Sequence, residues 1–74
     1  SDLGLTGLEL KILLLLTRRV EQVYSREQII EGVWGQTHIS DRTVDSHIAH
    51  LRQKLKSTRV TLETVKNIGY RVTT

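Results

Sequence analysis

The segment SDRTVDSHIAHLRQKL, from Ser40 to Leu55, constrains the fold more than any other part of the chain. Its apolar residues recur at three- and four-residue steps, as in Val44, Ile48 and Leu51, which predicts one amphipathic helix with a single buried face. The opposite face carries small and polar residues with basic residues along its edges, where a solvated face would usually carry Glu and Lys pairs. We therefore expect one side of this helix to line a small core and the other to contact a partner.

Two further helices are predicted upstream. In LTGLELKILLLLTRR, Thr6 stands three residues before Glu9, and in YSREQIIEGVWG, Ser25 stands three residues before Gln28. This spacing is typical of a capping box at a helix N-terminus, so Glu9 is assigned to the start of the first helix. Gly35 predicts the end of the second helix. The first helix is apolar around most of its circumference, so we expect it to be covered on more than one side.

The period of the sequence changes near the C-terminus. The segment VTLETVKNIGYRVTT is rich in β-branched residues, and KNIG separates two short runs of strand character. Asn67 and Gly69 tolerate positive φ, which favours a hairpin at this point. The predicted fold is mainly α with a small β hairpin. Its order of elements is that of a winged helix-turn-helix, with three helices and a C-terminal β wing.

The composition limits the class of protein. A chain of 74 residues forms one small domain that buries only about 60% of its unfolded surface. The absence of cysteine excludes disulfides and thiolate metal sites and fits a reducing compartment. No apolar run approaches the roughly 20 residues of a membrane span, and no signal peptide is visible. Because methionine is absent even at the start, residues 1–74 are expected to be a single domain from a longer protein.

The sequence does not predict an enzyme. It contains no glycine-rich phosphate loop, no paired-carboxylate motif and no convincing nucleophile with its base. His47 and His50 are three residues apart, but with three histidines and no cysteine in the chain a metal site is not expected. We therefore expect no cofactor and no small-molecule substrate.

The charge of the chain is uneven. Residues 1–41 carry four basic and six acidic side chains, whereas residues 42–74 carry seven basic and two acidic ones. A basic half favours a polyanionic partner. The major groove of DNA, about 12 Å wide, admits a helix with small residues at the closest approach, polar side chains for the base edges and basic residues for the phosphates. In the predicted third helix, the small residues are Ser46 and Ala49 and the polar residues for base edges are His50 and Gln53. The basic residues for the phosphates are Arg42 and Arg52.

Four segments, LTGLELKILLLL, SREQIIEGVWG, SDRTVDSHIAHLRQKL and TVKNIGYRV, resemble the winged-helix DNA-binding domain of OmpR/PhoB-type transcription factors. The resemblance runs from Leu5 to Val72, and its most specific part is DRTVD.HI..LR.KL followed by GYR. It implies sequence-specific binding of double-stranded DNA by a transcriptional regulator. The recognition helix, at about residues 40–56, would enter the major groove. The wing, at about residues 62–73, would lie on the adjacent backbone or minor groove.

The resemblance also implies roles for single residues. Those nearest the bases are Ser46, His47, Ala49, His50 and Gln53. Those on phosphates are Trp34, Arg42, Thr43, Arg52 and Thr64. Those of the wing are Lys66, Asn67 and Arg71. The family's turn is commonly Arg-Gly-x-Gly-Tyr, and here it reads KNIGY, so Asn67 is expected to take the left-handed conformation of a glycine.

Partners and context follow from the same resemblance. In this family the domain usually follows a phosphorylatable receiver domain, as in two-component response regulators, and less often belongs to a membrane-anchored activator. The implied partners are double-stranded DNA, RNA polymerase through the loop at residues 35–39, and a second copy of the chain on direct repeats. The implied location is the cytoplasm, with no membrane contact by this segment. A four-stranded N-terminal sheet packs on the first helix in this family, and this sequence starts after almost all of it.

Some alternatives remain open at this point. Trp34 and His47 have a packing role as an alternative to DNA contact. Asp45 is expected to orient Arg42 or Arg52. The whole domain could instead be a winged-helix protein-interaction module without DNA binding, which would dock through the exposed apolar part of the first helix.

Overall fold

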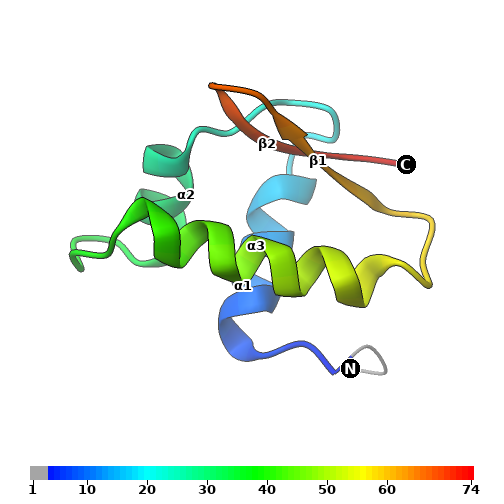
Figure 1. The fold of residues 1–74 in the computed structure, drawn as a ribbon, viewed down its shortest axis with the longest axis horizontal. Coiled ribbons are helices and arrows are strands. Elements are labelled where there is room, and N and C mark those ends of the chain that lie inside the picture. Colours follow the sequence, from blue (N-terminus) through cyan, green and yellow to red (C-terminus); the bar gives the residue numbers. More distant parts are fainter. Residues whose placement is uncertain (1–3) are drawn as a thin grey trace.

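The computed structural model describes residues 4–74, which form three helices followed by a two-stranded antiparallel hairpin. In chain order the elements are α1 (Gly7–Thr17), α2 (Arg26–Val33), α3 (Asp41–Leu55), β1 (Thr61–Val65) and β2 (Gly69–Thr73). Figure 1 shows α3 crossing the front of the molecule, with α1 and α2 behind it and the hairpin along one side of it. The predicted mainly α fold with a C-terminal β wing is confirmed.

The helices begin where their capping residues predict. The hydroxyl of Thr6 accepts from the Glu9 amide at 3.1 Å, and the Glu9 carboxylate accepts from the Thr6 amide at 2.8 Å. Ser25 and Gln28 form the same reciprocal pair at the start of α2, at 3.1 and 2.8 Å. Ser40 caps α3 through its hydroxyl. These bonds satisfy amide groups that the first turn of a helix leaves without partners.

A single core joins the helices to the hairpin. The apolar stripe predicted on α3 is buried along its whole length, and its residues pack with apolar side chains of α1, α2 and both strands. The buried core residues are Ile12, Leu16, Tyr24, Ile29, Val44, Ile48, Leu51, Leu55, Leu62, Tyr70 and Val72. Burial of this one stripe fixes which face of α3 remains available to solvent.

The hairpin is held by a tight turn and by its own place in the core. Leu62 pairs with Val72 across the two strands, and both side chains are buried. The Ile68 amide donates to the Val65 carbonyl at 3.0 Å and closes the turn. Asn67 has φ 65°, which confirms the left-handed conformation expected of it.

The segment before α2 pairs with the outer edge of β2, a contact that the sequence did not predict. The Tyr24 amide donates to the Tyr70 carbonyl at 2.8 Å, and the Tyr70 amide donates to the Tyr24 carbonyl at 2.9 Å. The Glu21 amide adds a bond of 2.8 Å to the Val72 carbonyl. A Cβ on Gly69 would lie 2.0 Å from the Tyr24 carbonyl oxygen. The close approach of these two segments therefore requires glycine at this position.

The outer face of α1 is apolar, as its sequence predicted, but the structure leaves this face exposed rather than covered on a second side. Leu10 and Leu14 expose 43% and 58% of their surface, and no described residue covers them. Within residues 4–74, no helix has the length and apolar character needed to cross a membrane.

Candidate nucleic-acid interface

The face of α3 opposite the core is exposed, and the side chain at its centre is small. Ser46, Ala49, His50 and Gln53 all lie on this face and are exposed. Their polar side chains form no hydrogen bond or ion pair with any other residue of the part that the structure describes, residues 4–74. Ala49 keeps the middle of the face low, so another molecule can come close to the helix backbone. The polar groups beside it are free to bond to that molecule.

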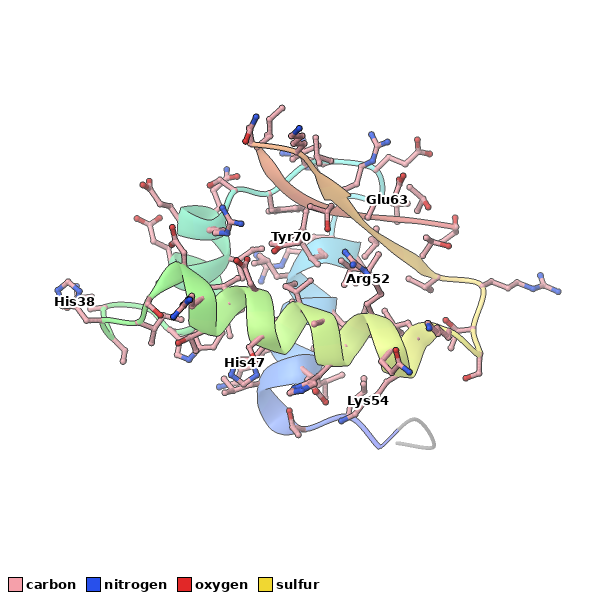
Figure 2. All side chains as sticks on the ribbon, viewed as in Figure 1. His38, His47, Arg52, Lys54, Glu63 and Tyr70 are labelled. Atoms are coloured by element: carbon pink, nitrogen blue, oxygen red, sulfur yellow. The ribbon has the colours of Figure 1, made fainter. Side chains whose placement is uncertain are left out.

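The basic edge of α3 is tied to the hairpin by one arginine. Arg52 Nε donates to the Leu62 carbonyl at 3.2 Å, and Arg52 Nη2 donates to the Thr64 hydroxyl at 2.5 Å. Figure 2 shows Arg52 reaching from α3 toward the strands. The residue remains exposed, and a guanidinium has five N–H donors, so bonding to the hairpin leaves donors for an anion. Arg42 is exposed and Thr43 is half-buried, both in the first turn of α3.

Two aromatic side chains meet at the other edge of α3. The rings of Trp34 and His47 lie 5.6 Å apart between centroids, at an interplanar angle of 48°. Both residues are half-buried, and Trp34 packs against the core at the C-cap of α2. This contact matches the packing alternative for both residues, and it places them beside the exposed face rather than at its centre.

The loop between α2 and α3 projects from the same end of the molecule. Gly35 has φ 68° and follows the last turn of α2, as its position in the sequence predicted. Residues 36–38 are exposed, and Figure 2 shows His38 at the outer end of this loop.

The hairpin carries its own basic groups. Lys66 and Asn67 are exposed at the turn, and Thr64 is exposed on β1. Arg71 faces Glu63 across the two strands, and its Nε donates to the Glu63 carboxylate at 3.0 Å. The wing therefore presents its free positive charge at the tip, while Arg71 is neutralised within the sheet.

Asp45 does not orient Arg42 or Arg52, so that expectation is wrong. Its carboxylate instead accepts from Arg26 Nε at 2.8 Å and from Arg26 Nη2 at 3.2 Å. The Tyr70 hydroxyl donates to the same carboxylate. The Arg26 guanidinium also lies 5.9 Å from the centroid of the Tyr70 ring. These three residues, here called the Asp45 cluster, join α2, α3 and β2.

The electrostatics of the Asp45 cluster favour its ionised form. Hydrogen bonds from Arg26 and then from Tyr70 lower the pKa of Asp45, although burial opposes them. The bond to Asp45 raises the pKa of Arg26 in turn. Burial, followed by the bond to Asp45, raises the pKa of Tyr70. At neutral pH the cluster is therefore a carboxylate, a guanidinium and a neutral phenol.

Glu9 does more than start α1. Lys54 Nζ lies 2.6 Å from the Glu9 carboxylate and 2.9 Å from the Gly4 carbonyl. Burial raises the pKa of Glu9, but the hydrogen bonds from Lys54 and from the Thr6 amide outweigh it and hold that pKa below its ordinary value. Figure 2 shows Lys54 on the opposite side of α3 from Arg52. Lys54 is therefore part of the fold rather than of the exposed face.

Three helices, a β wing and an exposed third helix with basic edges define a winged helix-turn-helix domain. Residues 1–72 match the family described as "Transcriptional regulatory protein, C terminal", and the chain belongs to that family. This confirms the OmpR/PhoB-type resemblance seen in the sequence. It also agrees with the expectation of a regulator rather than an enzyme.

Individual relatives support the same assignment. The chain is 48% identical over 75 residues to the heme response regulator HssR of Staphylococcus aureus. The matched region covers 97% of this chain and 34% of that protein. The DNA-binding domain of Bacillus subtilis CssR is 37% identical, with a TM-score of 0.84 over 95% of this chain and 78% of that one. The Klebsiella pneumoniae RstA DNA-binding domain, solved in complex with RstA box, is 28% identical, with a TM-score of 0.80 over 95% and 73%. The chain thus spans about a third of the length of the curated relative.

Proposed function

We propose that this domain binds specific sequences of double-stranded DNA as the effector part of a transcriptional regulator. The observation that carries the proposal is the outer face of α3, which is exposed, small at its centre and polar beside it. A helix with such a face fits the major groove, where base edges carry the sequence information. The DNA complex of the RstA domain, which has the same fold, supports this assignment.

The roles of single residues follow from their positions. Ser46, Ala49, His50 and Gln53 would face the bases, and His47 would contact them only from the edge where it packs on Trp34. The proposed phosphate contacts on both sides of this face are Trp34, Arg42, Thr43, Arg52 and Thr64. In the wing, Lys66 and Asn67 would reach the adjacent backbone or minor groove, and Arg71 would stiffen the strands through Glu63.

The context of the domain is also part of the proposal. We infer a single domain at residues 1–74 within a longer cytoplasmic regulator, in line with the length of the HssR relative. A response regulator is the form that the name of this relative supports, and a receiver domain in the longer protein is a proposal from the family resemblance. Contact of loop 35–39 with RNA polymerase and pairing of two copies on direct repeats are further proposals from the family resemblance. The exposed Leu10 and Leu14 on α1 would then be covered by another part of the longer protein.

The test of DNA binding is a salt titration on a duplex selected from a random library. Affinity of the wild type should fall steeply with salt, with a logarithmic slope of about 0.9 for each phosphate neutralised. Arg52→Ala should weaken binding to all duplexes alike and reduce this slope by about 1, because Arg52 is assigned to a phosphate. Fluorescence anisotropy on labelled duplexes gives both quantities.

The matched control for this variant is Arg19→Ala. Arg19 is exposed between α1 and α2, so its loss changes the net charge by the same amount without touching the proposed interface. If the wild type binds no duplex in a salt-dependent way even at low ionic strength, the proposal fails. The protein-interaction alternative would then be favoured.

Gln53→Ala and His50→Ala should alter sequence preference rather than general affinity. A side chain bonded to a base edge contributes about 1–3 kcal/mol of discrimination, so preference at one base pair should relax roughly 10-fold. Selection from a random library before and after each substitution measures the change, with the exposed Gln22→Ala as control. An equal loss on every sequence would contradict the assignment to base readout.

A further inference from the structure

We propose that Asp45 is a positioning residue that sets the orientation of the wing relative to the recognition helix. This inference rests on the proposed function, because the orientation matters only if α3 and the hairpin contact one duplex together. Asp45 would act through Tyr70 on β2, while Arg26 on α2 holds the carboxylate in place.

The geometry of the hairpin provides the first step. Apart from apolar packing, two polar connections join α3 to the strands within the described residues: Arg52 to β1 and Asp45 to β2. Asp45 and Arg52 are seven residues apart, which is about two turns of helix, so both project from the same side of α3. One connection would leave the hairpin free to rock about it. Two connections, one to each strand, fix its direction along the helix.

The position of Tyr70 provides the second step. Tyr70 is the second residue of β2, close to the turn that carries Lys66 and Asn67, and its side chain is buried. Its backbone also pairs with Tyr24 on the other edge of β2. A shift of the Tyr70 hydroxyl therefore moves the rigid tip of the wing and, with it, the proposed contacts of Lys66.

The Arg26–Asp45 ion pair is partly open to solvent, so its effect on wing orientation can be distinguished from its effect on folding stability. The side chains of Arg26 and Asp45 are 42% and 40% exposed. Ion pairs that are this open to solvent add little to folding stability. Their bidentate geometry is nevertheless directional, because two parallel N–H groups fix the plane of the carboxylate that Tyr70 then meets. We therefore expect loss of the pair to affect wing placement more than folding.

The charge of Asp45 makes the expected result distinctive. Removing a negative charge beside the proposed DNA-binding face should strengthen binding to a polyanion if charge alone mattered. The positioning role predicts the opposite result. Asp45→Asn should weaken binding even though the variant has one more net positive charge.

The experiment compares two duplexes that carry the selected site. One duplex extends beneath the wing, and the other ends before it. Asp45→Asn and Tyr70→Phe should each weaken binding to the long duplex about 5- to 10-fold and reduce its salt slope by about 1, because one wing phosphate contact is lost. On the short duplex, Tyr70→Phe should bind as the wild type does, and Asp45→Asn should bind at least as tightly because it lacks one negative charge. Their combination should be less than additive, since both remove the same connection.

The controls keep each outcome decisive. Glu31→Gln on the exposed face of α2 makes the same charge change and should not weaken binding to either duplex. Urea unfolding gives the folded fraction of each variant. If Asp45→Asn does not fold, Tyr70→Phe tests the same connection, because it removes the hydroxyl that bonds to Asp45. Tighter binding to the long duplex, or equal loss on both duplexes with an unchanged slope, would overturn the positioning role. Failure of the wild type to bind any duplex would instead overturn the proposed function.

Discussion

Replacing Gly69 by Ala should lower the free energy of unfolding by about 3 kcal/mol or more. The new Cβ would lie 2.0 Å from the Tyr24 carbonyl oxygen and 2.8 Å from Ser25 Cα, and both are backbone atoms that cannot rotate away. Relief of the clash requires breaking the two hydrogen bonds between Tyr24 and Tyr70. Each buried polar group left without a partner costs about 1–3 kcal/mol.

The size of the domain makes this loss large. A chain of 74 residues is stable by only about 4–11 kcal/mol at ordinary values per residue. A loss of 3 kcal/mol should lower the Tm by about 15 °C, which calorimetry measures directly. Chemical denaturation at 25 °C gives the same change as a shift in the midpoint.

Two other glycines serve as matched controls. A Cβ on Gly7 meets no atom within 4 Å, so Gly7→Ala in the first turn of α1 should be neutral or slightly stabilising. Gly35 also has free space around it, but its φ of 68° should make Gly35→Ala cost about 1 kcal/mol. If Gly69→Ala is no more destabilising than Gly35→Ala, the close contact with Tyr24 does not hold β2 in place.

Local signals account for the parts of the fold that the sequence predicts. The capping boxes at Thr6 and Ser25, the stripe on α3 and the turn at Asn67 each depend on residues within a few positions of one another. Such interactions are encoded by spacing alone, so they can be read without knowing the rest of the fold. The exposed face of α3 follows in the same way, because burial of one stripe exposes the opposite one.

The contacts that the sequence does not predict all join distant segments. The partner of Asp45 is Arg26, nineteen residues away, rather than an arginine of its own helix. Pairing of Tyr24 with Tyr70 leaves no strand-length pattern, because only a short stretch before α2 takes part. Each of these contacts depends on how the elements cross, and that is set by packing of the whole core. Opposite charge on α2 and α3 was visible in the sequence, but their distance was not.

Replacing Lys54 by Met should destabilise this domain more than the loss of an exposed charge does. The Glu9 side chain is only 3% exposed, and removal of Lys54 would leave its carboxylate buried with the Thr6 amide as its remaining hydrogen-bond donor among the described residues. Breaking a buried pair commonly costs about 3–5 kcal/mol, but Lys54 itself is 31% exposed, so part of the effect is screened. We expect a loss of about 2 kcal/mol at neutral pH. Lys11→Met, an exposed lysine on α1, should change stability by less than about 0.5 kcal/mol.

The pH dependence identifies the cause of this loss. In the wild type, burial raises the pKa of Glu9, but its hydrogen bonds lower it by more, so the pKa lies below its ordinary value. The contribution of the Lys54–Glu9 pair to folding stability is therefore present at neutral pH and is lost as the pH falls through that pKa. In Lys54→Met burial dominates and the pKa of Glu9 should lie above its value in the unfolded chain, about 4.3. The variant is then penalised at neutral pH, and protonation of Glu9 relieves the penalty. The stability difference from the wild type should therefore shrink between pH 7 and about pH 4 in urea unfolding series.

Glu9→Gln combined with Lys54→Met should recover part of the loss at neutral pH, because no charge remains buried. A difference that is constant over this pH range, or no recovery in the double variant, would mean that Lys54 acts through packing of its alkyl chain rather than by neutralising Glu9.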